Sequence, residues 1–171
     1  MEDLQEERTA LAEAINQNRF WEAVHAESFI ARSESPREVC LEEVRKSHIY
    51  IGIFKKRYGY IPDDNNPRRV SAVILEYEEA KNNHLPIIIL ISKDTSDRES
   101  RLEEFLREIT DFDKGHWRKE YATTNELIQL SIESINYELT KTAVKTIEAC
   151  RKEQIHSTYN LPYFKRVKEN F

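Results

Sequence analysis

Glycine is scarce in this sequence, with three residues among 171. The phosphate-binding loop of P-loop proteins and the dinucleotide fingerprint of Rossmann domains each place several glycines at fixed spacing. Neither motif is present here, so a nucleotide site of either kind is excluded.

Cysteine and long apolar runs are also scarce. Two cysteines, Cys40 and Cys150, are too few for a disulfide framework, which predicts a reducing, cytoplasmic location. No apolar run approaches the ~20 residues of a membrane span. The acidic start Met1-Glu2-Asp3 is not that of a secretory signal. We therefore expect no membrane partner.

Metal and nucleic-acid sites are not indicated either. The five histidines show no ligand spacing with cysteine or carboxylate, so we predict no metal site. The net charge of −5 argues against a general nucleic-acid partner. Charged residues make up 33% and hydrophobic residues 39%, which is typical of a soluble globular chain.

Two apolar runs predict the centre of the fold. Ile49 to Phe54 and Pro86 to Ile91 are rich in β-branched residues, as in strands of a parallel sheet that are buried on both faces. Between them, residues 55–69 form a polar loop interrupted by prolines, and a helix is predicted over residues 70–83.

The remaining elements follow from periodicity and capping signals. Helices are predicted over residues 2–18, from Ser35 with Glu38 as a capping box, from Ser96 with Glu99 as a second box, and from Thr123. Short strands are predicted over residues 20–25 and, at an edge, over residues 117–121. The last helix passes Cys150.

This alternation predicts an α/β fold in which helices sandwich a parallel sheet. Such three-layer, flavodoxin-like folds usually begin with a strand that becomes central, whereas this chain begins with a helix. We therefore expect the usual first strand to be lacking. We divide the chain into an α/β domain over residues 1–140 and a helical extension with a tail over residues 141–171.

Ligands of open α/β sheets bind beyond the carboxyl ends of the strands, so the loop after Phe54 holds the candidate binding residues. Its basic residues fit an anion site for a nucleotide phosphate, or equally a solvated basic loop. Tyr58 can stack on a base or pack the loop, and Gly59 fits a turn with positive φ. The basic residues are Lys55, Lys56, Arg57, Arg68 and Arg69.

Glu76 is the candidate catalytic residue. On a helix over residues 70–83 it lies on the flank of the apolar stripe, at the rim of the sheet. Cleavage of an N-glycosidic bond uses a carboxylate beside an oxocarbenium-like centre. The alternative is a solvated helix glutamate. Glu27, after the first predicted strand, can face the same cleft or lie on the surface.

Several short motifs resemble the TIR-like family catalogued as domain of unknown function 4062. They are Asp3-Leu4-Gln5-Glu6-Glu7-Arg8, Ser35-Pro36 with Val39-Cys40-Leu41, Ser47, Ile49-Tyr50-Ile51-Gly52-Ile53, Arg57-Tyr58-Gly59, Ser71, Glu76-Tyr77-Glu78-Glu79-Ala80 and Pro86. The resemblance covers about residues 2 to 140. It implies a fold related to TIR and nucleoside deoxyribosyltransferase domains, some of which cleave N-glycosidic bonds with a glutamate on the helix equivalent to that of Glu76. It also adds Ser71 to the candidate ligand-binding residues Lys55, Arg57, Tyr58 and Gly59.

Members of that family usually carry a further strand ahead of the segment that matches Asp3 to Arg8. Three arrangements can replace it. The strand lies upstream of Met1, a partner chain donates it, or residues 20–25 pair directly with residues 49–54. We favour direct pairing or self-association, because an open gap would leave backbone amides unpaired.

Two functions from different classes are therefore expected. The first is a TIR-like signalling, sensor or interaction module that self-associates or binds another signalling domain. The second is a nucleotide-binding N-glycosidase, acting on an NAD-like ligand or a nucleoside through Glu76. We favour the module and predict no bound cofactor beyond such a nucleotide.

Overall fold

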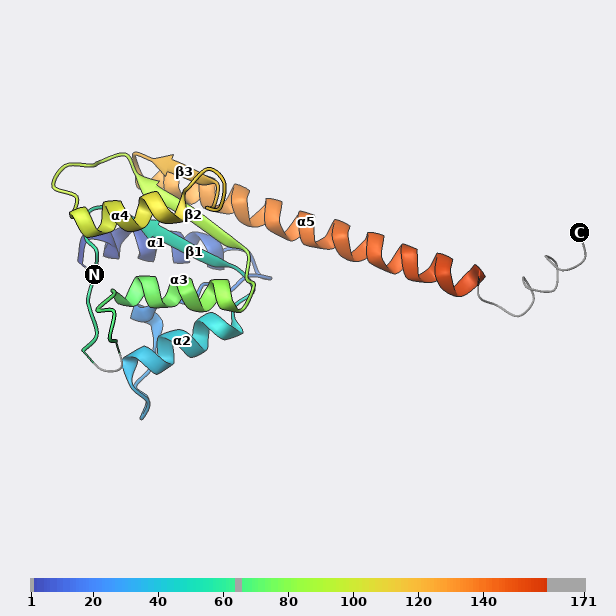
Figure 1. The fold of residues 1–171 in the computed structure, drawn as a ribbon, viewed down its shortest axis with the longest axis horizontal. Coiled ribbons are helices and arrows are strands. Elements are labelled where there is room, and N and C mark those ends of the chain that lie inside the picture. The colour runs from blue at the N-terminus through green and yellow to red at the C-terminus, as the bar shows by residue number, and fades with distance from the viewer. Residues whose placement is uncertain (1, 64–65, 160–171) are drawn as a thin grey trace, which may run out of the picture. The chain divides into compact units, whose positions relative to one another are not determined.

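A parallel sheet forms the centre of the computed structural model, which describes residues 2–63 and 66–159. Among these residues, β1 (Tyr50–Phe54) pairs with β2 (Ile87–Ser92), and β2 pairs with β3 (Arg118–Tyr121), all in parallel. The order β1-β2-β3 places β2 in the middle (Figure 1). The predicted parallel pairing and the predicted edge strand near residue 121 are confirmed.

Burial follows from this order. Five of the six β2 residues are buried, because neighbouring strands and helices cover the strand on all sides. In β1, Ile51 and Ile53 are only half-buried, because β1 lies at the edge of the sheet. The prediction of burial on both faces is therefore correct for β2 and wrong for one face of β1.

Helices cover the two faces of the sheet. Figure 1 shows α3 and α4 on one side and α1 on the other, and α2 packs on α3. Their bounds are α1 Gln5–Asn16, α2 Pro36–Lys46, α3 Ala72–Asn82, α4 Ser100–Ile109 and α5 Thr124–Tyr159. Two short 3-10 turns are η1 Glu2–Leu4 and η2 Ala26–Ser28. The result is the predicted three-layer, flavodoxin-like α/β fold.

Each face of the sheet has its own hydrophobic core. Tyr77 and Phe105 join α3 and α4 to the face that carries Tyr50 and Phe54. On the opposite face, the core consists of Leu11, Ile15, Ile88, Leu90, Tyr121, Leu127 and Ile135. The first part of α5 therefore shares a layer with α1, while β2 contributes to both cores.

The helix starts test the capping predictions. Ser35 Oγ accepts from the Glu38 amide at 3.2 Å, and the Ser35 amide donates to the Glu38 carboxylate at 3.2 Å. This capping box is confirmed, as is the cap of Thr123, whose Oγ1 accepts from the Glu126 amide at 3.2 Å.

The predicted capping box of Ser96 and Glu99 is wrong. Helix α4 begins at Ser100, and Glu99 makes no side-chain cap. The Glu99 carboxylate instead accepts from the Tyr58 amide at 3.1 Å, and the Ser96 hydroxyl lies 2.5 Å from Asp94 Oδ1. The Glu99 carboxylate therefore binds the loop after β1, whereas the local sequence pattern predicted that it would cap the helix.

The strand predicted over residues 20–25 is absent from the structure. In the described part of the chain no backbone hydrogen bond joins this segment to β1, so direct pairing with residues 49–54 is also wrong. Trp21 and Ala23 pack beside β1 and α1, but the Ala23 amide donates to Asn16 Oδ1 at 2.8 Å. The side chains of residues 20–25 alternate between exposed and half-buried, as in a strand, but this segment pairs with no described strand.

Helix α5 is long, as predicted. Its 36 residues extend over ~54 Å at 1.5 Å per residue. The chain divides into two compact units, residues 1–135 and residues 136–171. Our division of the chain into a domain over residues 1–140 and an extension over residues 141–171 stays a prediction, and residues 160–171 lie outside the described residues. No helix in the described part of the chain has the length and apolar character needed to cross a membrane.

Candidate functional site

Glu76 lies on α3 in a half-buried position. The Cys40 thiol, from the neighbouring helix α2, forms a hydrogen bond with its carboxylate. Arg8 from α1 and Glu27 from η2 also act on it electrostatically. Since α1 and α3 cover opposite faces of the sheet, these charges meet beside β1, where the described part of the chain places no further strand between the two layers.

Burial raises the pKa of Glu76 to about 7. The positive charge of Arg8 and the hydrogen bond from Cys40 lower it, whereas the negative charge of Glu27 raises it further, so burial prevails. At neutral pH this carboxyl group can therefore both donate and accept a proton, which suits general acid–base chemistry.

The pKa of Glu27 is shifted in the opposite direction, below its usual value. Burial alone would raise its pKa, but hydrogen bonds from Arg8 and His25 lower the pKa to about 2. Arg8 pairs with its carboxylate directly, and His25 Nδ1 lies 3.1 Å from Glu27 Oε2. Near pH 7 Glu27 is therefore ionised, whereas Glu76 is close to the midpoint of its titration.

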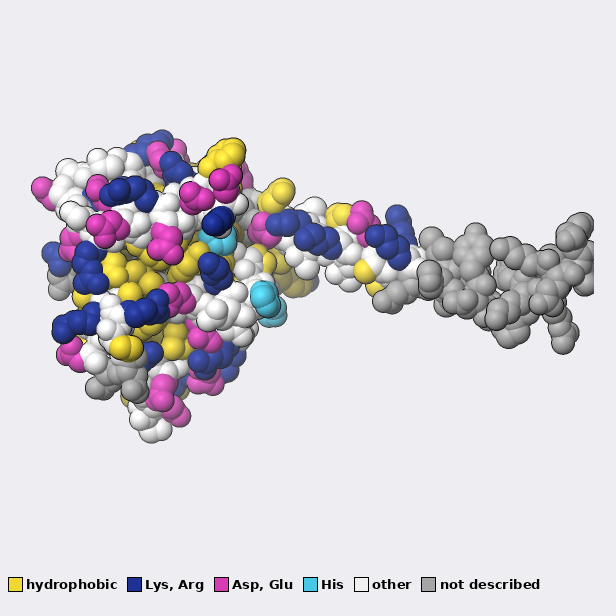
Figure 2. Space-filling model, viewed as in Figure 1, with side chains coloured by type: hydrophobic (Ala, Val, Ile, Leu, Met, Phe, Trp, Pro, Cys, Tyr) yellow, Lys and Arg dark blue, Asp and Glu magenta, His cyan; other side chains and the backbone are white. Residues whose placement is uncertain are grey.

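The basic loop after β1 forms ion pairs within the domain. Lys55 Nζ lies 2.5 Å from Glu7 Oε1, and this hydrogen bond raises the pKa of Lys55. Lys56 Nζ lies 2.8 Å from Asp94 Oδ2. Arg68 pairs with Glu78. In Figure 2, basic and acidic side chains adjoin one another across the visible face.

Tyr58 and Gly59 have structural roles. Tyr58 is buried in the core, and Arg101 lies over its ring at 4.3 Å, so the ring is not free to stack on a ligand. Gly59 has φ 98°, which confirms the predicted turn with positive φ. The Arg57 side chain is exposed, and its amide donates to Asp3 Oδ2 at 3.2 Å. None of these three residues is among the described groups that act on Glu76.

Ser71 is fully buried directly before α3. Its hydroxyl has no hydrogen-bond partner among the described residues and does not cap the helix. A buried polar group without a partner costs ~1–3 kcal/mol. Ser71 therefore makes no side-chain cap for α3, and its role in ligand binding stays a prediction.

We expect Ser71→Ala to leave the domain equally stable or more stable, by up to about 1 kcal/mol, because it removes an unpaired buried hydroxyl. Urea denaturation of both proteins measures this difference. A loss of more than about 1 kcal/mol would show that the hydroxyl does form a hydrogen bond in the folded protein.

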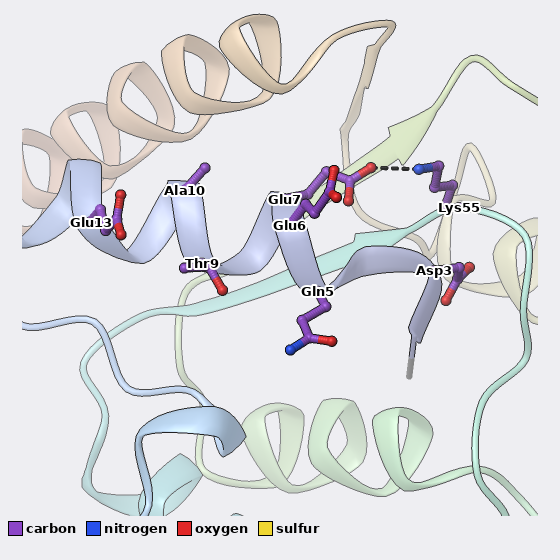
Figure 3. A pocket seen from close by; sticks show the side chains of 8 residues that line it. All are labelled: Asp3, Gln5, Glu6, Glu7, Thr9, Ala10, Glu13 and Lys55. Carbon is purple, nitrogen blue, oxygen red and sulfur yellow. Dashed lines mark hydrogen bonds and ion pairs between the residues drawn. The ribbon is translucent and has the colours of Figure 1, made fainter.

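A groove of about 650 Å³ lies along α1 (Figure 3). Figure 3 shows that its lining side chains come from α1 and the turn before it, with Lys55, after β1, paired with Glu7. The lining residues are Asp3, Gln5, Glu6, Glu7, Thr9, Ala10, Glu13 and Lys55. The groove is therefore predominantly acidic, and Glu76 does not line it.

Arg8 and the acidic residues of this groove were not predicted from the sequence as site residues. Asp3, Glu6, Glu7 and Arg8 all lie within the first motif of the family resemblance, which was the available signal. Their periodicity on α1 identified the buried face, but not which carboxylates would line a groove. Among the described side chains, no group of three or more histidine, cysteine, aspartate or glutamate residues is placed to hold a metal ion.

A family model described as "Domain of unknown function (DUF4062)" matches residues 1–136. The chain belongs to this family. No curated protein and no solved structure matches the chain. The match ends one residue after the first compact unit, so the DUF4062 domain comprises the sheet, α1 to α4 and the first part of α5. Glu76, Arg8, Glu27 and the groove all lie within it.

Proposed function

We propose that this DUF4062 domain is a TIR-like interaction module of a signalling or defence system, rather than a nucleotide-cleaving enzyme. The observation that carries the proposal is the internal pairing of the basic loop. Lys55, Lys56 and Arg68 already have carboxylate partners, so an anionic ligand would have to displace Glu7, Asp94 and Glu78.

Two further observations support a module. Tyr58 is buried beneath Arg101, so its ring is not available for stacking on a base. Among the described residues, the outer sides of β1 and β3 have no strand partner, and such edges commonly pair with another chain; the edge of β1 is the longer. A partner in self-association or another signalling domain fits this edge better than a nucleotide fits the loop.

The experiment is incubation of the protein with NAD or with purine and pyrimidine nucleosides, followed by chromatography of the products. We expect wild-type protein to release no more free base than the Glu76→Gln variant. Release of nicotinamide or a nucleobase by wild type, abolished in Glu76→Gln, would overturn the interaction module in favour of catalysis.

N-glycosidase activity is the second candidate, and one observation favours it. Burial raises the pKa of Glu76 to about 7, and strongly shifted carboxyl groups are concentrated at functional sites. The same assay decides between the two, because the catalytic proposal requires turnover that depends on the Glu76 carboxylate.

A further inference from the structure

The second half of α5 is helical but exposed on all sides. Ile128, Ile132 and Ile135, in the first half, pack in the core that α5 shares with α1. The first compact unit ends at residue 135, and every side chain from residue 139 to residue 152 is exposed. The helix nevertheless continues without a break to Tyr159. Residues 136–159 therefore form a helix outside that unit.

The apolar stripe of the first half continues into the second half with a period of eleven residues. The corresponding positions are Ile128 and Leu139, Ile132 and Ala143, Ile135 and Thr146, and Leu139 and Cys150. An eleven-residue period, ~3.67 residues per turn, keeps a stripe on one side of a helix and is typical of helices that wind around one another. We call Leu139, Ala143, Thr146 and Cys150 the distal stripe.

A helix of this length requires a packing partner. Residues 136–159 extend over ~36 Å, and helices in proteins take most of their stability from the packing of an apolar face. Several β-branched residues, with low helix propensity, lie in this half; they are Thr140, Thr142, Val144, Thr146 and Ile147. The ion pair of Lys141 with Glu138 at 3.0 Å supports the helix only locally.

The charges of this half avoid the distal stripe. Between residues 136 and 152 they are Glu138, Lys141, Lys145, Glu148, Arg151 and Lys152. At ~100° per residue, each of them lies roughly 100° or more from the centre of the stripe. A partner that presented charged side chains here would find no counter-charge, and its charges would lose their hydration. The same stripe of a second copy is uncharged as well, so the two stripes can meet while the charges of both helices stay in water.

We propose that the distal stripe is a dimer interface, covered by the same stripe of a second copy of this chain. This inference rests on the proposed interaction module and names its partner. Leu139 supplies the larger apolar contact, and the small side chain of Ala143 lets the two helices approach closely. The pairing continues, with a second helix, the burial that Ile128, Ile132 and Ile135 receive from their own domain.

The test is sedimentation velocity of the full-length chain over a range of protein concentrations. We expect wild-type protein to shift from monomer to dimer as its concentration rises. The Leu139→Lys/Ala143→Lys variant should weaken dimerisation by about tenfold or more, because it sets lysines of the two copies against each other. Both positions are exposed and lie outside the first compact unit, so the domain should stay folded, which thermal unfolding checks.

The matched control is Tyr137→Lys/Val144→Lys, which places two lysines at exposed apolar residues of the same helix. Both residues lie roughly 130° or more from the centre of the distal stripe, so this variant should dimerise like wild type. The proposal fails if wild-type protein stays monomeric up to about 1 mM. It also fails if both variants weaken dimerisation equally, or if the Leu139→Lys/Ala143→Lys variant dimerises like wild type, because association would then use another surface. The NAD assay tests the interaction module separately, because dimerisation can fail while cleavage remains absent.

Discussion

At pH 8 the Glu76→Gln variant should unfold at a higher temperature than the wild-type protein. Burial raises the pKa of Glu76 from 4.5 to about 7, so the folded state holds this proton more tightly than the unfolded state. Stability is therefore lost as pH rises from about 4.5 to 7, up to a limit of about 3 kcal/mol above pH 7. Glutamine keeps the shape and stays uncharged, so this loss disappears.

The difference between the two proteins should shrink below about 1 kcal/mol at pH 5, where Glu76 is protonated in the folded protein. Thermal or urea unfolding across this pH range measures it. Glu104→Gln, at an exposed position on α4, is the control and should match wild type at each pH. A Glu76→Gln variant that is less stable at pH 8 would show that ionised Glu76 is held by favourable contacts, with Arg8 the first candidate.

Leu90→Ala should destabilise the domain by about 2–5 kcal/mol, the largest stability effect we expect. Leu90 lies in the central strand β2, is fully buried and belongs to the core formed with α1 and α5. Truncation to alanine removes apolar contacts of Leu90. It also leaves a cavity between the sheet and the helix layer of α1 and α5, which cannot readily close.

Urea denaturation monitored by circular dichroism measures this loss. Leu139→Ala is the control, because Leu139 is 40% exposed on α5 and its truncation should change the free energy of unfolding by less than about 1 kcal/mol. If Leu90→Ala were as mild as Leu139→Ala, the central position of β2 in the sheet would be wrong.

The central strands and helices could be predicted from sequence because their signals are local. Residues 49–54 and 86–91 are apolar without interruption, and Ser35 with Glu38 marks a helix start in four residues. Residues 20–25 carried a local strand pattern too, but a strand also requires a partner backbone. The described structure provides no such partner, so these residues do not form a strand although their side chains alternate.

The candidate site was predicted only in part, for a related reason. The flank position of Glu76 on α3 follows from helix periodicity alone. The pairing of the basic loop does not, because Glu7 lies 48 residues before Lys55 in sequence and Asp94 lies 38 residues after Lys56. Arg8 was missed because its contact with Glu27 depends on the path of the segment between them.

Amide hydrogen exchange within β1 tests most directly whether this domain keeps a free sheet edge. In the isolated protein, we predict strong protection at Gly52 and Phe54, whose amides face β2, and exchange at least about a hundredfold faster at Ile51 and Ile53. Equal, strong protection at all four amides would contradict the account, because it would mean that a strand already occupies the outer edge of β1.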